Sequence, residues 1–116
     1  MSRDDAFVLD MLLAAEDAWA FCAGVAREDF MADRVLQYAT VRALEIIGEA
    51  ARHVSGELRL AQPEIPWAQI VATRHRIAHD YSHVDWTVVW EIVQKDLPGL
   101  VTALRAIVPP AEETAL

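Results

Sequence analysis

The segment from Thr73 to His83 carries the side chains of this chain that are best suited to chemistry. It holds three of the four histidines and two of the ten Lys and Arg residues. Arg74 presents a planar guanidinium that fits a phosphate group, and His79 titrates near neutral pH and can transfer protons. Such a pair could cleave RNA without a metal: the histidine would take the proton of a ribose 2′-hydroxyl, and the arginine would stabilise charge on the phosphate.

The spacing of Arg74 and His79 sets a condition on the fold. Residues five positions apart are separated by about 140° on a regular helix and do not share a face. The two side chains would converge only if the helix ends near His79. Complete acid–base catalysis uses two proton-transfer groups, and a homodimer would supply a second copy of the histidine. His75, Arg76 and Glu45 are candidate auxiliary residues.

Each of these residues also has a purely structural interpretation. An Arg-x4-His spacing is common by chance and means little by itself. Arg76, near the C-terminal end of a helix, could simply complement the helix dipole. His83 could be a solvated loop residue, and Tyr81 could pack with its hydroxyl on a backbone carbonyl.

The elements that must position this segment are predicted to be helices, because apolar residues recur at three- and four-residue steps along most of the chain. We expect four: Asp4 to about Val25, Asp33 to about Val54, Trp67 to about His79, and a last one from near Val84 to Val108. No stretch alternates with period two for long enough to predict a strand. The resulting expectation is an all-α, four-helix, up-down-up-down bundle.

Several residues mark the expected boundaries of these helices. Asp33 is a plausible N-cap, and Pro66 suits the first turn of the third helix. The run from Ser82 to Asp85 has the form of a capping box for the fourth, and Pro98 should kink that helix. Residues 1–110 form one expected domain, and residues 111–116 an expected disordered tail.

Composition excludes several classes of protein and favours an oligomer. A net charge of −8 argues against broad electrostatic binding of nucleic acid, so any RNA contact must use a local basic cluster. Apolar residues make up 54% of the 116 residues, a surplus that hints at a subunit interface. The lone cysteine, Cys22, excludes an internal disulfide and is expected to be buried. Without zinc-site spacing, a signal peptide or a membrane-length apolar run, a metal-free cytoplasmic protein is expected.

Read as one motif, Arg74-x4-His79-x-Tyr81 resembles the Arg-x4-His-x-Tyr motif of the HepT-like HEPN ribonucleases, the toxins of the MNT–HEPN toxin–antitoxin systems. The similarity extends over nearly the whole chain. Further matching runs are Asp10–Leu12 with Ala14–Glu16, Arg42–Ala51, Pro63–Trp67, Ile77–Tyr81, Val84–Asp85 and Val89–Trp90, in the expected order. Several motifs in order carry much more weight than the Arg-x4-His spacing alone.

The resemblance implies a dimeric helical bundle in which two copies of the motif line one cleft and cleave RNA without a metal or other cofactor. Arg74 and His79 would be the catalytic pair. The implied partner, in a type VII-like system, is a minimal nucleotidyltransferase antitoxin of the MNT class, which would silence the toxin by AMPylation of Tyr81. The chain departs from the family in one respect, because His75 replaces the polar residue, often Asn, that usually follows the arginine.

Two other functions compete with a toxin ribonuclease. The chain could be a non-catalytic helical partner or substrate of the nucleotidyltransferase, which the negative net charge mildly favours. Alternatively, the cluster of Arg and His residues could bind a nucleotide or another small phosphate, although no Gly-rich loop supports this. Glu45 and Glu49, one turn apart on the second helix, could orient Arg74 or could simply be solvated, and for Glu49 solvation is slightly favoured.

Overall fold

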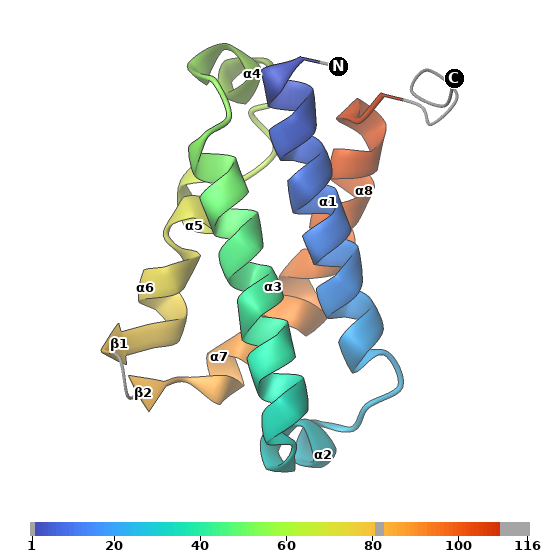
Figure 1. Ribbon diagram of the computed structural model, residues 1–116, viewed down its shortest axis with the longest axis vertical. Coiled ribbons are helices and arrows are strands. Elements are labelled where there is room, and N and C mark those ends of the chain that lie inside the picture. The colour runs from blue at the N-terminus through green and yellow to red at the C-terminus, as the bar shows by residue number, and fades with distance from the viewer. Residues whose placement is uncertain (1, 81–82, 110–116) are drawn as a thin grey trace.

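The computed structural model describes residues 2–80 and 83–109, and for residues 79 and 80 it describes the backbone only (Figure 1). The long elements are α1 (Arg3–Cys22), α3 (Arg34–Arg52) and a composite rod of α7 (Trp86–Glu91), the π-helix η1 (Ile92–Asp96) and α8 (Leu97–Ile107). The short ones are α2 (Arg27–Ala32), α4 (Gly56–Ala61), α5 (Trp67–Val71), α6 (Thr73–Ile77), β1 (Ala78–Asp80) and β2 (His83–Val84). The predicted all-α class is confirmed.

One continuous apolar core joins these helices. α1 packs most extensively against α3 and next against α8, while α5 and α6 lie along the other side of α3 (Figure 1). Phe30, in the short helix α2, is completely buried in this core. Cys22 is buried as predicted, and burial raises the pKa of its thiol.

The first two long helices begin close to where their sequences predict. Ser2 and Asp5 form a capping box at the start of α1, and the Asp33 carboxylate accepts the backbone N–H of Leu36 at the start of α3. Both helices end two or three residues before the expected positions, α1 at Cys22 and α3 at Arg52. Gly24 follows α1 with a positive φ of 72°, a conformation in which glycine carries no Cβ penalty.

The predicted single helix from Trp67 to His79 is wrong, because the structure breaks it at Ala72. The carbonyl of Ala72 accepts the N–H groups of both His75 and Arg76, at 2.9 and 3.2 Å, and so starts a new short helix, α6. At Ala78 the backbone becomes extended, with φ −142° and ψ 124°. The motif segment therefore leaves helical geometry before His79 is reached.

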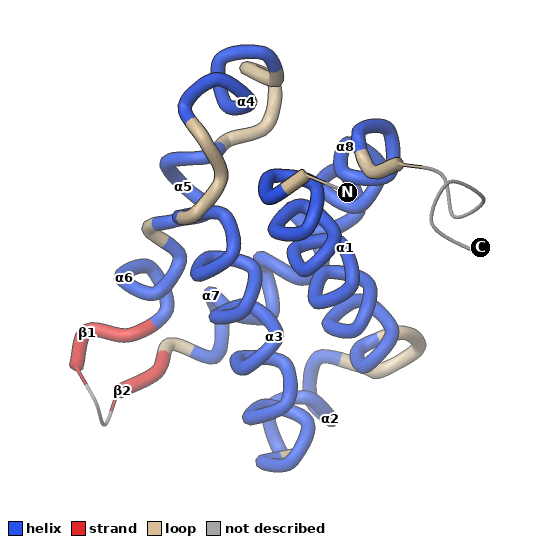
Figure 2. Tube along the Cα trace, turned by 45° about the horizontal axis from the view of Figure 1, so that its top comes forward, coloured by secondary structure: helices blue, strands red, loops and turns tan. Residues whose placement is uncertain are grey.

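The prediction that the chain contains no strand is also wrong. β1 and β2 pair in an antiparallel fashion, with Ala78 opposite Val84 and Asp80 opposite His83, and the register is irregular between the two pairs. The pairing is too short to produce a visible period-two pattern, which explains why no strand was predicted there. In Figure 2 this hairpin projects from the helical body beyond α6 and α7.

The last rod begins and bends differently from the prediction. α7 begins at Trp86, where the Asp85 side chain is itself the N-cap and accepts the N–H of Val88 at 3.2 Å; Ser82, the predicted cap, lies outside the described residues. The expected disturbance at Pro98 falls just before it, as the π-helical turn in which the N–H of Leu97 bonds to the carbonyl of Ile92. Proline clashes with the carbonyl four residues earlier, and widening the preceding turn relieves that clash.

No helix within residues 2–80 and 83–109 is long and apolar enough to cross a membrane. The tail over residues 111–116, predicted to be disordered, lies outside the described part of the chain.

Candidate functional site

The three consecutive side chains of α6 that face solvent form the basic cluster of the chain. Thr73 and Ile77, four residues apart, are buried on the inner side of this helix, and the Thr73 hydroxyl donates to the carbonyl of Gln69 at 3.2 Å. These two anchors turn the residues between them outward, so that Arg74, His75 and Arg76 are all exposed. An exposed guanidinium is what a phosphate ligand requires.

The geometry of Arg74 and His79 differs from the one assumed for a regular helix. His79 lies in β1, two residues beyond the end of α6, so the separation of about 140° that a continuous helix would impose does not apply. The side chain of His79 and the whole of Tyr81 lie outside the described structure. Convergence of the catalytic pair therefore stays a prediction.

Arg76 has a partner that the sequence did not reveal. Its guanidinium lies 3.5 Å from the carboxylate of Asp96, in the π-helical turn, and both side chains are about half exposed. The pair borders a largely apolar cavity of about 390 Å³ between α3, α5 and the last rod. Because Asp96 compensates part of its charge, Arg76 is less available to a phosphate than Arg74.

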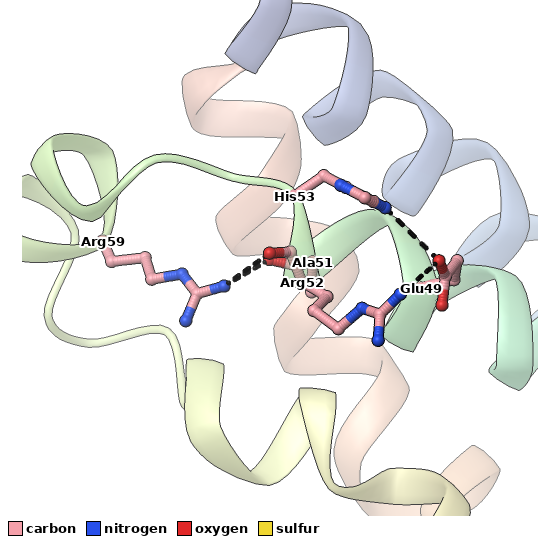
Figure 3. A network of polar contacts seen from close by, with 5 residues as sticks. All are labelled: Glu49, Ala51, Arg52, His53 and Arg59. Carbon is pink, nitrogen blue, oxygen red and sulfur yellow. Dashed lines mark hydrogen bonds and ion pairs between the residues drawn. The ribbon is translucent and has the colours of Figure 1, made fainter.

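The two glutamates considered as orienting groups do not pair with Arg74. Figure 3 shows Glu49 held by Arg52 and His53 at the C-terminal end of α3, at 3.0 and 3.3 Å. The hydrogen bond with His53, followed by the charge of Arg52, lowers the pKa of the Glu49 carboxyl. The solvated interpretation of Glu49 is therefore correct. Glu45 is half-buried, and within the described residues no ion pair joins it to Arg74.

Metal ligands do not gather in the part of the chain that the structure describes: no three His, Cys, Asp or Glu side chains there could hold one ion. What the segment does offer is a set of exposed cations beside a histidine-bearing strand. Such a set can bind a phosphodiester and stabilise negative charge on it.

Comparison with known proteins decides the family. Residues 11–107 match the family model described as "Ribonuclease HepT-like". The chain belongs to the HepT-like ribonuclease family. Over 102 residues it is 37% identical to a Methanocaldococcus jannaschii protein named as a "putative RNase", covering 86% of this chain and 94% of that one. It is also 37% identical to a "probable ribonuclease HepT" of Thermococcus cleftensis, covering 81% and 86% of the two chains. No solved structure matches the chain.

As a HepT-like ribonuclease, the chain is an endoribonuclease, as its sequence predicted. The matched region contains the whole of the basic cluster on α6 and both strands of the hairpin. Two features of this region were not predicted: the Asp96 partner of Arg76, and an aromatic pair formed by Tyr38 and Trp86. Both features join residues that lie far apart in the sequence, so no local pattern could have predicted them.

Proposed function

We propose that this chain is the toxin of an MNT–HEPN, type VII-like toxin–antitoxin system and cleaves RNA without a metal through Arg74 and His79. The observation that supports the proposal is the exposure of Arg74 on a short helix whose inner side is anchored by Thr73 and Ile77. This anchoring holds the guanidinium outward in a chain whose net charge of −8 otherwise disfavours contact with a phosphate.

The proposed reaction is an intramolecular transesterification of RNA. His79 removes the proton of a ribose 2′-hydroxyl, and the 2′-oxygen attacks the adjacent phosphorus. The bond from phosphorus to the 5′-oxygen of the next nucleotide breaks, which leaves a 2′,3′-cyclic phosphate. The departing oxygen takes a proton from a second acid, supplied by His79 of a second copy or by His75. Arg74 stabilises the negative charge that builds up on the phosphate oxygens.

Regulation in this proposal falls on Tyr81. A cognate nucleotidyltransferase would attach AMP to its hydroxyl, two residues beyond His79. The added phosphodiester carries a negative charge and would pair with the arginines of α6, as anionic groups commonly do. It would occupy the position of the RNA phosphate, so cleavage would stop while the fold remained intact.

Two substitutions with matched controls test the catalytic assignment. Arg74→Ala and His79→Ala should each reduce cleavage of single-stranded RNA by at least about 100-fold, the scale of one general base or one charge-stabilising group. Arg52→Ala and His53→Ala remove the same residue types from the far end of α3 and should cleave like wild type. Circular dichroism checks the fold of all four. EDTA should leave the wild-type rate unchanged, and loss of activity in EDTA would contradict the metal-independent mechanism.

The alternative is a non-catalytic partner or substrate of the nucleotidyltransferase, which the net charge of −8 mildly favours. In that case Tyr81 would still accept AMP, but purified protein would not cleave RNA, and Arg74→Ala would change neither property. A cleavage assay beside the modification assay separates the two functions.

A further inference from the structure

An aromatic pair of one exposed and one half-buried ring lies next to the motif segment, at the junction of α3 and α7. The rings of Tyr38 and Trp86 are 6.1 Å apart between centroids and inclined at 54°. Trp86 packs partly against the core, whereas Tyr38 is 56% exposed. The core side chains near Tyr38 are buried, whereas its ring remains in contact with water. Exposed apolar surface of this kind can mark a binding site.

Arg34 fixes the outer ring of this pair. Its guanidinium carbon lies 5.6 Å from the centre of the Tyr38 ring, and one of its nitrogens donates to the Tyr38 hydroxyl at 2.9 Å. The tyrosine is thus held on one side by a cation and on another by Trp86. We call Arg34, Tyr38 and Trp86 the aromatic platform.

The platform lies on the side of α3 that faces the motif helix. Tyr38 and Gly48 are ten residues apart, so about 80° separates them around the helix. A Cβ on Gly48 would lie 3.1 Å from the carbonyl of Ile70, in α5, and Tyr38 contacts α7 through Trp86. In Figure 1, α6 lies between α5 and α7 along this same side.

The other half of the platform follows the motif directly in the chain. The N–H of Asp85 donates to the carbonyl of Ile77 at 2.7 Å, which brings Trp86 beside the end of α6 and the start of β1. We therefore expect a chain of RNA whose phosphate lies at Arg74 to extend along the end of α6 toward Trp86.

The charged side chains around the platform favour binding of a polyanion. Arg34 belongs to it, and Arg27 lies next to it through a contact of 3.4 Å with the hydroxyl of Thr87. The carboxylates of Asp33 and Asp85 each accept a backbone N–H at the start of a helix. Their negative charge is thereby partly offset by the N-terminal end of that helix.

We propose that the aromatic platform is a subsite that stacks an unpaired base of single-stranded RNA, next to the nucleotide that is cleaved. This inference rests on the proposed ribonuclease function and extends it to substrate class. Aromatic faces stack bases of any identity, and a guanidinium beside them adds a cation–π contribution. Proteins bind single-stranded RNA by such stacking, whereas bases inside a duplex are already stacked on both faces. The subsite thus predicts preference for unpaired RNA with little sequence specificity.

The test measures binding of a fluorescein-labelled, single-stranded 2′-O-methyl RNA of twelve nucleotides by anisotropy. The methyl groups block the nucleophile, so binding is observed without cleavage. Tyr38→Ala should weaken Kd about 5- to 150-fold, the range for losing one stacked base. Tyr38→Phe keeps the ring and should bind like wild type. Phe21→Ala, which removes an aromatic ring that is 41% exposed near the end of α1, is the matched control.

A second oligomer, abasic at every position, separates stacking from charge. Wild type and Tyr38→Ala should bind it with equal Kd, and Tyr38→Ala should leave the salt dependence of RNA binding unchanged, since no phosphate contact is lost. Arg74→Ala should instead reduce that salt dependence.

Three results would overturn the subsite. Tyr38→Ala could bind the base-bearing oligomer like wild type, or it could lose affinity for both oligomers equally. Alternatively, light scattering could show that Tyr38→Ala has half the mass of wild type, in which case the platform holds a second copy of this chain. If wild type cleaves RNA through Arg74 while Tyr38→Ala binds normally, only the subsite fails. If wild type neither binds nor cleaves RNA, the proposed function fails with it.

Discussion

The backbone N–H of Asp85 and the carbonyl oxygen of Ile77 are joined by a hydrogen bond of 2.7 Å. The bond connects the last residue of α6 to the residue that caps α7, which are the two residues that flank the segment 78–84. Asp85 has two separate tasks, because its side chain accepts the N–H of Val88 while its backbone makes this closure. The motif segment is therefore held at both ends by helices that pack on α3.

Asp85→Ala should remove the cap of α7 and leave the backbone closure in place. The expected cost is about 1 kcal/mol in the free energy of unfolding, the usual value for losing an N-cap. Asp85→Asn keeps a side-chain acceptor and should recover most of it. Urea titration measures both variants. α7 begins directly after the motif segment, so Asp85→Ala should also lower the cleavage rate at temperatures where the protein remains folded. Ser2→Ala, which removes the cap of α1, should leave the cleavage rate unchanged.

The predicted homodimer rests on exposed apolar side chains as well as on the need for a second proton-transfer group. Leu13, Val35 and Leu60 are each more than half exposed, and large apolar surface in water usually marks an interaction site. Light scattering at micromolar concentration should give about twice the chain mass of 12.9 kDa. A clean monomer that still cleaves RNA would exclude a composite site built from two copies and leave His75 as the second acid.

Long-range periodicity made the main helices predictable. The Asp33 cap and the burial of Cys22 follow from local residue types repeated over several turns. The motif segment was less predictable because its geometry depends on contacts outside it. The break at Ala72 and the pairing of β1 with β2 involve too few residues to leave a periodic signal.

Part of the candidate site could also be predicted from the sequence. Exposure of Arg74 follows from the positions of its neighbours Thr73 and Ile77, which any helix would place inward together. The partner of Arg76 could not be predicted, because Asp96 is twenty residues away and reaches it only through the π-helical turn. Pairing at that distance requires the tertiary structure.

The contact between Asp4 and Ser55 should make stability depend on pH. The Asp4 carboxylate accepts the N–H of Ser55 at 2.9 Å and its hydroxyl at 2.5 Å. The hydrogen bond from the hydroxyl, followed by that from the N–H, lowers the pKa of Asp4. Because the folded pKa is below the unfolded value of about 3.9, the stabilisation is fully present above that pH. It is lost as the pH falls further, through the folded pKa.

A double-mutant cycle of Asp4→Asn and Ser55→Ala isolates this contact from the N-cap of α4, which Ser55 also supplies, and from the place of Asp4 in the first turn of α1. Urea titrations at pH 7 should give a favourable coupling free energy between the two positions. At pH 3 the coupling should be smaller, since protonation begins to remove the carboxylate in wild type. An equal coupling at both values would show that the charge of Asp4 does not matter.

Release of Arg76 from Asp96 should strengthen RNA binding. Asp96→Asn removes one negative charge beside the cluster and frees the guanidinium, so Kd for single-stranded RNA should fall severalfold at 50 mM salt and less at 200 mM. Arg76→Gln should weaken binding by a similar factor. Glu57→Gln removes the same charge from the distant helix α4 and controls for net charge. If Asp96→Asn and Glu57→Gln have equal effects, the contact with Arg76 has no role in binding.

The last prediction concerns Tyr81, which lies outside the described residues. In the sequence it follows Asp80, the last residue of β1, and is two residues beyond His79. AMP on the Tyr81 hydroxyl would bring a phosphodiester next to Arg74, and inhibition would then come from occupation of the RNA phosphate position. This mechanism predicts that modification weakens RNA binding and leaves the free energy of unfolding almost unchanged.

Intact-mass spectrometry after incubation with ATP, magnesium and a minimal nucleotidyltransferase of the MNT class tests the assignment. Wild type should gain one or more AMP units, and Tyr81→Phe none at that position. Tyr38→Phe, which removes the only other tyrosine hydroxyl, should be modified like wild type. Modified wild type should lose both cleavage and affinity for the 2′-O-methyl RNA, while Arg74→Ala should bind that RNA equally weakly with and without AMP. Rapid cleavage by fully modified protein would refute control by site occupation, because the phosphodiester and the RNA phosphate cannot share one position.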